Sequence, residues 1–464
     1  MARVLDPEAV TSLAAYVNGG GGRGLDAAGK LGPGGVIAEI EASVLRGRGG
    51  AGFPTGTKWA TVAANRPPEV PGTVVVNGAE GEPGSFKDRS ILRRNPYRVL
   101  EGALVAALAV GADRVVVALK ASFGPELARV REAIAEVGAA GWAEGVELAV
   151  LEGPGEYLYG EETALLEVLE GRQPFPRIAP PFRHGAEADE GGTSATPTLV
   201  NNVETLANVG AILAEGPEWF RTEGTDASPG TIVCTVTGRT ARHGVAEVAM
   251  GTPLRQVIDT VGGGPSPGSR VVAVLSGVSH PLLPAALLDT PLTYEDMEAA
   301  GTGLGAAGFI VFDETADLAA VAQGVARFLA VESCGQCTPC KQDGLALAEL
   351  LDQVRRSDSD EADVTAIEDR IRTVTDEARC FLAHQQQRVL DSVFTLFLDD
   401  IKGHLAGTAE PAEAELIAPI VDLDGARAVL DEGHAAKQPD WTFDEVDSGT
   451  APADRIDQRS DAPE

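Results

Sequence analysis

Between residues 71 and 170, short apolar runs alternate with longer segments of helical periodicity. The apolar runs that suggest strands lie at residues 73–77, 114–119 and 146–151, and the helical segments at residues 97–110, 125–137 and 161–170. Strand–helix alternation of this kind predicts a parallel sheet with helices packed on its faces. Such sheets bind ligands beyond the carboxyl ends of their strands, so the polar loops 78–84 and 152–160 are candidate binding loops.

The remaining chain divides by composition and pattern. Residues 228–313 are rich in Val, Thr and Gly and predict a small α+β domain, with strands near 231–236, 271–275 and 308–312 and a helix over 254–261. Residues 315–405 are almost entirely helical by pattern. We therefore expect an α/β multidomain protein with these units: an N-terminal helical segment (1–45), a ligand-binding α/β domain (46–227), an α+β domain (228–313), a helical domain (314–405) and an acidic extension (406–464), disordered from about Asp447.

Charge and hydropathy exclude several classes of partner. The 464 residues include 37 Lys and Arg against 69 Asp and Glu, a net charge of −32. That charge repels nucleic acid and anionic lipid surfaces. The longest apolar stretch, residues 102–112, is much shorter than the about 20 residues that span a bilayer, so we expect no direct membrane insertion. No export signal is visible at the N-terminus, and a cytoplasmic location is the expectation.

The cysteines form the strongest local signal. Cys334, Cys337 and Cys340 are spaced three residues apart, and Cys380 follows 40 positions after the third. Four thiolates suit a [4Fe–4S] cluster or a structural zinc ion. Three closely spaced ligands and one distant ligand favour a single cluster, with zinc or unliganded thiols as the alternatives. Cys234 lies in an apolar strand and is expected to be a core residue.

A glycine-rich loop, GRGGAGF over residues 47–53, precedes the α/β region. Its G-x-G-x-x-G pattern is weak evidence for a dinucleotide site, because residues 36–45 look helical and Phe53-Pro54 blocks a simple helix start. A tight turn is one interpretation. The other is an anion site built from backbone N–H groups, Arg48 and Lys58.

Three further polar motifs follow. In NGAEGEPG (residues 77–84), the acids would hydrogen-bond ribose hydroxyls or a heterocycle rather than phosphate. In YLYGEET (157–163), the acids favour the start of a helix. TLVNNVET (198–205) is either a helix cap or a set of amides aimed at a ligand. For the first two motifs an ordinary surface turn is an equal alternative.

Five motifs in sequence resemble one family. They are GRGGAGFPTGTKW (47–59), the stretch from Glu80 to Arg89, GEETALLEVLEG (160–171), PTLVNNVETLANV (197–209) and ESCGQCTPC (332–340). In this order they are similar to the FMN-binding, roughly 51-kDa flavoprotein subunit of respiratory complex I. The related diaphorase subunits of NAD-linked formate dehydrogenases and NAD-reducing hydrogenases share the module. The resemblance runs from about residue 40 to residue 405.

The resemblance implies a fold, cofactors and partners. The fold would comprise a Rossmann-like FMN domain, a ubiquitin-like β-grasp domain at 228–313 and a helical domain holding one [4Fe–4S] cluster. NADH would transfer a hydride to FMN, which passes single electrons to the cluster. The implied partners are a small [2Fe–2S] subunit, a larger iron–sulfur subunit or a ferredoxin, through which the protein would be peripheral to a membrane.

The resemblance also assigns site residues, with no catalytic acid or base because hydride transfer requires only alignment. The cofactor-binding set is Gly47, Arg48, Gly49, Gly50, Ala51, Gly52, Phe53, Lys58, Asn77, Glu80, Glu82, Gly160, Glu161, Glu162, Phe182, Asn201, Asn202 and Thr205. Within it, Phe53 and Phe182 resemble the aromatic residues that stack on NADH. Cys334, Cys337, Cys340 and Cys380 resemble the cluster ligands.

Four positions depart from the family pattern. Ala79 stands where Asp is usual, Ala179 where a Lys contacts NADH, and Tyr159 where Cys is frequent; Phe-Leu-Ala follows Cys380. Arg177 or Arg183 could replace the missing lysine. Two functional hypotheses therefore stand: an NADH-oxidising flavoprotein subunit, and a ferredoxin-linked flavin and iron–sulfur relay that has lost NADH use. A cofactor-free structural relative is a third, weaker interpretation.

Overall fold

A computed structural model describes residues 3–187 and 195–457. A four-stranded parallel sheet forms the centre of the α/β domain, with strand order β3-β2-β1-β6. Its strands are β1 (Gly72–Asn77), β2 (Ala112–Lys120), β3 (Glu147–Gly153) and β6 (Thr198–Asn202). The predicted strand–helix alternation is confirmed for β1 to β3. The strand β6 was not predicted, because its only apolar residues are Leu199 and Val200.

Helices cover both faces of this sheet. Val74 and Val76 point to a core shared with α2 (Arg23–Ser43), α5 (Pro96–Val110), α6 (Gly124–Ala139) and α8 (Val203–Glu215). Val75 points to the opposite face, where it packs with Leu165 and Leu166 of α7 (Glu162–Leu169). The alternation of side chains along β1 thus buries both faces, as in other parallel sheets.

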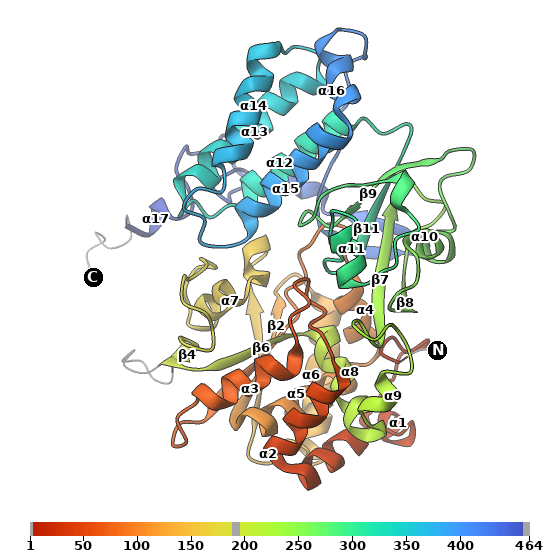
Figure 1. Ribbon diagram of the computed structural model, residues 1–464. Helices are drawn as coiled ribbons and strands as arrows, with labels where there is room; N and C mark the ends of the chain where they lie inside the picture. The colour runs from red at the N-terminus through yellow and green to blue at the C-terminus, as the bar shows by residue number, and fades with distance from the viewer. Residues whose placement is uncertain (1–2, 188–194, 458–464) are drawn as a thin grey trace.

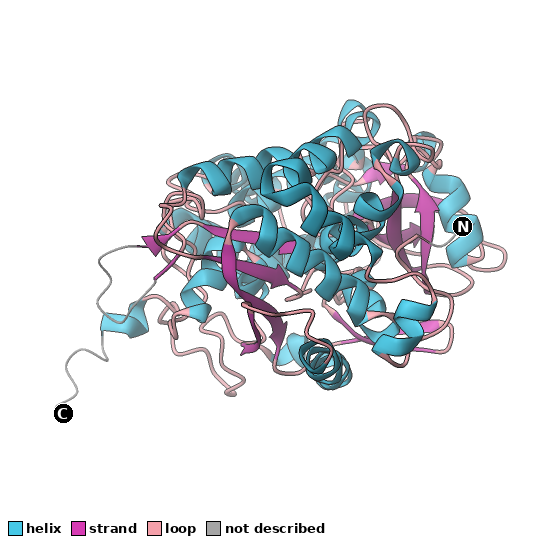
Figure 2. Cartoon of the chain, turned by 90° about the horizontal axis from the view of Figure 1, so that it is seen from below, coloured by secondary structure: helices cyan, strands magenta, loops and turns pink. Residues whose placement is uncertain are grey.

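A second sheet forms the neighbouring domain, with strand order β10-β9-β11-β7-β8. Its strands are β7 (Thr231–Gly238), β8 (Gly244–Ala249), β9 (Val271–Ser276), β10 (Leu283–Pro284) and β11 (Gly308–Asp313), and α10 (Leu254–Gly262) packs on it. The last strand, β11, lies between β9 and β7 and runs parallel to β7. This arrangement is a β-grasp, as expected. The two sheets lie at separate ends of the molecule (Figure 2).

Five helices form the helical domain, which stands above the α/β domain in Figure 1. They are α12 (Leu318–Glu332), α13 (Thr338–Arg355), α14 (Glu361–Thr373), α15 (Leu382–Leu396) and α16 (Leu398–Leu405). Their apolar core includes Ala273 and Leu275 of β9 and also Leu158 of the α/β domain. The helical domain therefore packs on both other domains. None of the helices in the described residues is long and apolar enough to cross a bilayer.

The acidic extension is ordered through residue 457. It forms a hairpin of β12 (Ile420–Asp424) and β13 (Arg427–Leu430), a 3-10 turn η3 (Glu432–Ala436) and α17 (Asp454–Asp457). The prediction of disorder from Asp447 is wrong for the described residues, because this segment has fixed partners: Ser448 N–H donates to the Asp440 carboxylate (3.3 Å) and Ala453 N–H to the Cys334 carbonyl (2.9 Å). Residues 458–464 lie outside the described residues.

The remaining elements are short or peripheral. They are α1 (Leu13–Asn18), α3 (Thr55–Asn65), α4 (Lys87–Arg94), η1 (Tyr157–Gly160), β4 (Ala186–Glu187), β5 (Ala195–Thr196), α9 (Pro217–Phe220), η2 (Ala285–Leu287) and α11 (Tyr294–Ala299). Of these, α3, α4, η1 and α11 carry residues of the site described next.

Candidate functional site

Three loops meet at the carboxyl ends of β1 and β6. Asn77, the last residue of β1, donates through Nδ2 to the carbonyl of Gly160 (2.8 Å). Lys58 of α3 forms an ion pair with Glu162 at the start of α7. These contacts join the glycine loop 46–54, the loop after β1 and the turn η1 at the sheet edge where parallel sheets bind ligands.

Hydrogen bonds join the two ends of the glycine loop, whereas the N–H groups in its middle have no acceptor among the described residues. Gly47 N–H donates to the Phe53 carbonyl (2.8 Å), and the Tyr294 hydroxyl donates to the Gly47 carbonyl (2.7 Å). In the described part of the chain, no acceptor lies in hydrogen-bonding geometry with the N–H groups of residues 49–52. Consecutive free N–H groups in a glycine loop form a cradle suited to phosphate.

Close packing fixes this loop. A Cβ atom at Gly49 would lie 3.2 Å from the Cβ of Asn202, and one at Gly52 would lie 2.5 Å from the ring of Tyr294. Gly52 also has φ of +61°, a conformation that favours glycine. The loop is therefore held between the α/β domain and α11 of the β-grasp domain.

The two cations near the loop differ in their surroundings. The Arg48 guanidinium is buried and donates to the carbonyls of Arg46 (3.3 Å) and Pro229 (3.1 Å). Its backbone N–H donates to Thr205 Oγ1 (2.8 Å). Arg48 thus stabilises the loop through backbone carbonyls. We had expected its guanidinium to face an anion, and it does not. Lys58 is partly exposed at the mouth of the site, and Phe53 is 54% exposed at the tip of the loop.

Glu80 caps a helix. Its carboxylate accepts from the N–H groups of Lys87 (2.9 Å), Asp88 (3.3 Å) and Arg89 (3.2 Å) at the start of α4, and from Ser85 Oγ (2.6 Å). Burial, reinforced by the carboxylate of Asp88, raises its pKa. These contacts orient the start of α4, and hydrogen bonding of Glu80 to a ribose or a heterocycle stays a prediction.

Behind Glu80 lies a buried ion network that sequence analysis did not single out. Lys87 Nζ is 2.8 Å from the Asp88 carboxylate and 2.9 Å from the Glu204 carboxylate, and Asn202 Nδ2 donates to Asp88 (2.6 Å). Burial alone would lower the pKa of Lys87, but Asp88, Glu204 and Glu80 together raise it. Lys87 is therefore charged, and Asn202 is oriented by this network. Its neighbour Asn201 accepts from Trp59 Nε1 (2.7 Å).

The acids at the start of α7 have separate structural partners. Glu161 is the N-cap of α7 and accepts from the N–H groups of Thr163 (3.0 Å) and Ala164 (2.8 Å). Burial raises its pKa. Glu162 is paired with Lys58 and is partly exposed. Only Glu162 is therefore placed to face a ligand at the mouth.

Tyr157 links this site to the helical domain. Its hydroxyl donates to one carboxylate oxygen of Glu82 and accepts from Gln385 Nε2 (2.8 Å). The other Glu82 oxygen accepts from Val278 N–H (2.7 Å). Its backbone N–H donates to Glu332 (2.9 Å) at the end of α12. Burial raises the pKa of Glu82, and the hydrogen bond from Tyr157 opposes that rise. The sequence motif did not indicate this role of Tyr157, because its partners are distant along the chain.

All four cysteines of the motif line one cavity in the helical domain. Its lining also includes Leu158, Pro176, Ser333, Gln336, Arg379 and Leu382. Cys337 is the N-cap of α13, Cys340 lies in its first turn, and Cys380 lies two residues before α15. The amino ends of two helices therefore face the thiols, and their dipoles favour negative charge there.

The four thiols line one cavity of about 10 Å³. Among the described residues, no group of three or more His, Cys, Asp or Glu side chains is arranged to hold one metal ion. Four thiolates are the ligands that a [4Fe–4S] cluster takes, and these thiols would move apart to admit one. Burial raises the pKa of Cys340 to about 11, so cluster binding must displace protons from these thiols.

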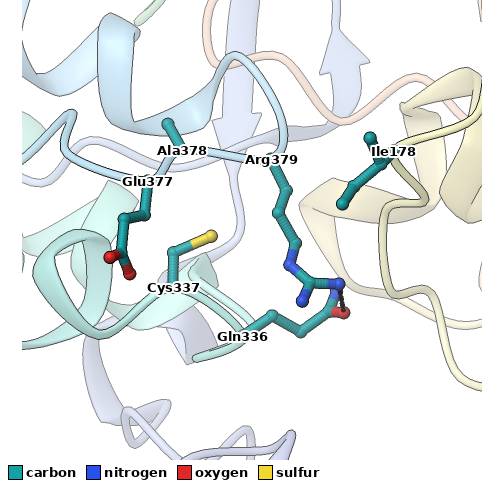
Figure 3. A pocket seen from close by; sticks show the side chains of 6 residues that line it. All are labelled: Ile178, Gln336, Cys337, Glu377, Ala378 and Arg379. Carbon is teal, nitrogen blue, oxygen red and sulfur yellow. Dashed lines mark hydrogen bonds between the residues drawn. The ribbon is translucent and has the colours of Figure 1, made fainter.

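A surface pocket of about 540 Å³ adjoins this cavity. Its lining comprises Ile178, Gln336, Cys337, Glu377, Ala378 and Arg379. The Cys337 sulfur points into the pocket, and Arg379 beside it donates to Gln336 Oε1 (3.2 Å; Figure 3). The cluster site therefore reaches the surface at Cys337.

The segment expected to contact NADH carries one available cation. Arg177 forms ion pairs with Glu167 and Glu170, and it donates to the Gly185 carbonyl (3.0 Å). Arg183 is exposed, with its guanidinium 5.8 Å from the centre of the Phe182 ring. Arg183 is thus better placed than Arg177 to substitute for the lysine missing at Ala179. The Ala79 methyl group is buried among apolar side chains, and its backbone N–H donates to Asn77 Oδ1 (3.2 Å).

Comparison with known proteins identifies the two regions. A family described as the Nuo51 FMN-binding domain matches residues 40–211, and one described as the NADH-ubiquinone oxidoreductase-F iron-sulfur binding region matches residues 320–404. An F subunit of NADH-quinone oxidoreductase from Rhizobium meliloti (strain 1021) is 36% identical over 85% of this chain and 94% of its own length. The F subunit of the same enzyme from Streptomyces coelicolor is 36% identical over 88% of this chain and 91% of its own.

A solved structure is similar over most of the chain. The NAD+-reducing [NiFe]-hydrogenase in its H2-reduced state superposes with a TM-score of 0.75 at 32% identity, covering 85% of this chain. The match spans 66% of the hydrogenase chain, so that chain contains further segments. The superposed 85% of this chain is longer than any one of its domains, so the similarity extends over more than one domain.

The glycine loop generates a first prediction. Gly52→Ala places a Cβ against Tyr294 and costs about 1–2 kcal/mol from the left-handed backbone alone, so the loop must shift. We expect a folded protein with a clearly lowered ratio of bound flavin to protein, measured by absorbance after gel filtration. Gly141→Ala, which has φ of +76° and where a Cβ meets open space, is the matched control and should retain its flavin. Equal flavin content in the two variants would contradict a tight cradle.

Proposed function

The chain belongs to the family of F subunits of NADH-quinone oxidoreductase, and from this premise we propose that it oxidises NADH by hydride transfer to FMN and passes single electrons through one [4Fe–4S] cluster. FMN supplies the chemistry that joins the two steps, because a flavin accepts an electron pair and releases it one electron at a time. The observation that carries the proposal is the direct linkage of the loops at the sheet edge to the four-cysteine cavity through Tyr157.

The residues of the sheet edge would bind and orient the flavin. The free N–H groups of residues 49–52 suit the phosphate, and Asn77, Asn201 and Asn202 present amides at the strand ends. The buried ion network of Lys87, Asp88 and Glu204 fixes Asn202 and lets it act without reorganisation. No side chain in this arrangement needs to transfer a proton during hydride transfer.

The mouth of the site would hold the nicotinamide nucleotide. Phe53 and Phe182 offer aromatic faces for stacking, and the partly exposed cations Lys58 and Arg183 lie beside them in the chain. Glu82 is held by Tyr157 and Val278, so its carboxylate has a fixed direction. These are binding and alignment roles, which is the contribution that hydride transfer requires of a protein.

Electrons would leave through the pocket at Cys337. Ile178 is 76% exposed and Phe381 44% exposed, and Arg379 lies between the cluster cavity and the surface pocket. A rim that combines exposed apolar side chains with Arg379 and the exposed acid Glu377 suits a protein partner that brings its own iron–sulfur centre within reach. We propose a small [2Fe–2S] subunit, a larger iron–sulfur subunit or a ferredoxin as that partner, and association with a membrane only through partner subunits.

The direct test is anaerobic reduction by NADH. Purified protein should contain one flavin and about four iron atoms per chain. Adding NADH should bleach the flavin absorbance within the mixing time of a hand-mixed cuvette. A flavin that stays oxidised with NADH yet bleaches with reduced ferredoxin would contradict NADH oxidation and favour the ferredoxin-linked relay.

Arg183 provides a prediction about nucleotide affinity. If its guanidinium contacts a phosphate of NADH, Arg183→Ala removes an interaction of about 1–2 kcal/mol and raises the KM for NADH about 5- to 30-fold. The kcat should change little, because the contact is made equally before and during hydride transfer. Arg221→Ala, which changes an exposed arginine directly after α9, is a control that should leave KM unchanged. An unchanged KM in Arg183→Ala would remove Arg183 from the nucleotide site.

A further inference from the structure

The C-terminal strap, which we define as residues 431–455, follows the last hairpin and lies against the cluster end of the helical domain. The family region that holds the cluster ends at residue 404. The strap is therefore outside the part of the chain that the family match explains. Its contacts nevertheless reach Cys334 and Lys341, the residue after Cys340.

The first half of the strap closes a buried charge cluster around Glu332. Lys437 Nζ lies 2.8 Å and His434 Nε2 lies 3.0 Å from the same Glu332 oxygen, and all three residues are buried. The other Glu332 oxygen accepts from Tyr157 N–H (2.9 Å). Since Glu332 lies two residues before Cys334, the strap supplies the charges that hold the junction between Tyr157 and the cluster loop.

Aromatic packing follows the same route. The His434 ring lies 4.9 Å from that of Phe328, and the Phe328 ring meets the edge of Tyr157 at 5.4 Å. The strap thus touches the junction through both polar and apolar contacts. Loss of either kind of contact exposes or unpairs groups that are now buried, at a cost larger than that of a surface contact.

The second half of the strap covers the cysteine loop itself. Trp441 Nε1 donates to the Val331 carbonyl (2.9 Å), and Ala453 N–H donates to the carbonyl of Cys334 (2.9 Å). A Cβ at Gly335 would lie 2.3 Å from the Cβ of Ala451, which shows how closely the strap approaches. Trp441 is held at φ of +65°, an unfavourable conformation for a large side chain that its contacts must maintain.

Lys341 adds a further contact between the strap and the cysteine loop. Lys341, the residue after Cys340, is buried and donates through Nζ to the carbonyls of Ala330 (2.9 Å), Ser333 (2.9 Å) and Pro439 of the strap. The strap therefore supplies an acceptor to a cation beside the third cysteine. Without it, that side of the cysteine loop would face water.

We propose that the C-terminal strap is a positioning element for the [4Fe–4S] centre, which covers the Cys334–Gly335 side of the cysteine loop and thereby sets the stability and reduction potential of the cluster. The inference rests on the cluster of the proposed function. Solvent exposure and backbone order near the sulfur ligands are among the factors that tune such clusters. Solvent stabilises the reduced cluster more than the oxidised cluster, because the reduced cluster carries more negative charge. Opening the strap should therefore raise the midpoint potential of the cluster.

Two aromatic positions in the strap allow a matched test in the full-length protein. Trp441→Ala removes the packed side chain, while Phe443→Ala removes one that is 64% exposed. In Trp441→Ala we expect several-fold faster loss of cluster absorbance in air and a higher midpoint potential in an EPR-monitored titration, with flavin content unchanged. Phe443→Ala should match the wild type in all three measurements. Equal cluster lifetime and potential in Trp441→Ala and the wild type would overturn the inference.

Two further variants keep the test decisive if Trp441→Ala does not fold. Trp441→Phe keeps an aromatic ring and loses only the Nε1 donor, and Lys437→Met keeps the length of the chain and removes the charge next to Glu332. Trp441→Phe should shift the potential in the same direction as Trp441→Ala, whereas Lys437→Met should lower it, because a cation near the cluster is lost. No shift in both would overturn the inference. A wild-type protein that binds no cluster would overturn the proposed function as well, so the two failures are distinguishable.

Discussion

Tyr157 holds the loops at the sheet edge and the helical domain at a fixed separation. Its hydroxyl lies between Glu82, on the loop after β1, and Gln385, on the helix that follows Cys380, and its N–H contacts Glu332 before Cys334. Electron transfer falls off steeply with distance, so two redox centres in separate domains work together only if the domains cannot drift apart. One half-buried tyrosine with partners in both domains satisfies that requirement.

In the proposed flavin site, buried charged side chains hold a neighbouring residue in place. Lys87, Asp88 and Glu204 are costly to bury singly; as one cation beside two carboxylates they stabilise one another and orient Asn202. Arg48 is likewise turned inward to backbone carbonyls. Among the described residues, the backbone N–H groups of residues 49–52 have no acceptor, and these groups are uncharged. Such a site can bind a flavin without competing internal charges.

Sequence patterns predicted local elements well because those elements depend on local periodicity. The Val-rich runs of β1 and β2 identified strands, and the spacing of Cys334, Cys337 and Cys340 identified a cluster motif. Partners distant in sequence were not predictable. The Glu80 carboxylate accepts from the N–H groups that begin α4, a contact that its motif did not indicate. The acidic composition of residues 447–457 predicted disorder, although specific contacts order them. Both contacts depend on partners that neither motif nor composition indicates.

The central claim is that electrons from NADH pass through the flavin to the four-cysteine centre of the same chain. Freeze-quench EPR of anaerobic protein mixed with NADH measures this directly. The account predicts the signal of one reduced [4Fe–4S] cluster, rising after the flavin bleaches and absent from a Cys380→Ala variant. A flavin that bleaches fully while the cluster stays oxidised at all times would contradict it.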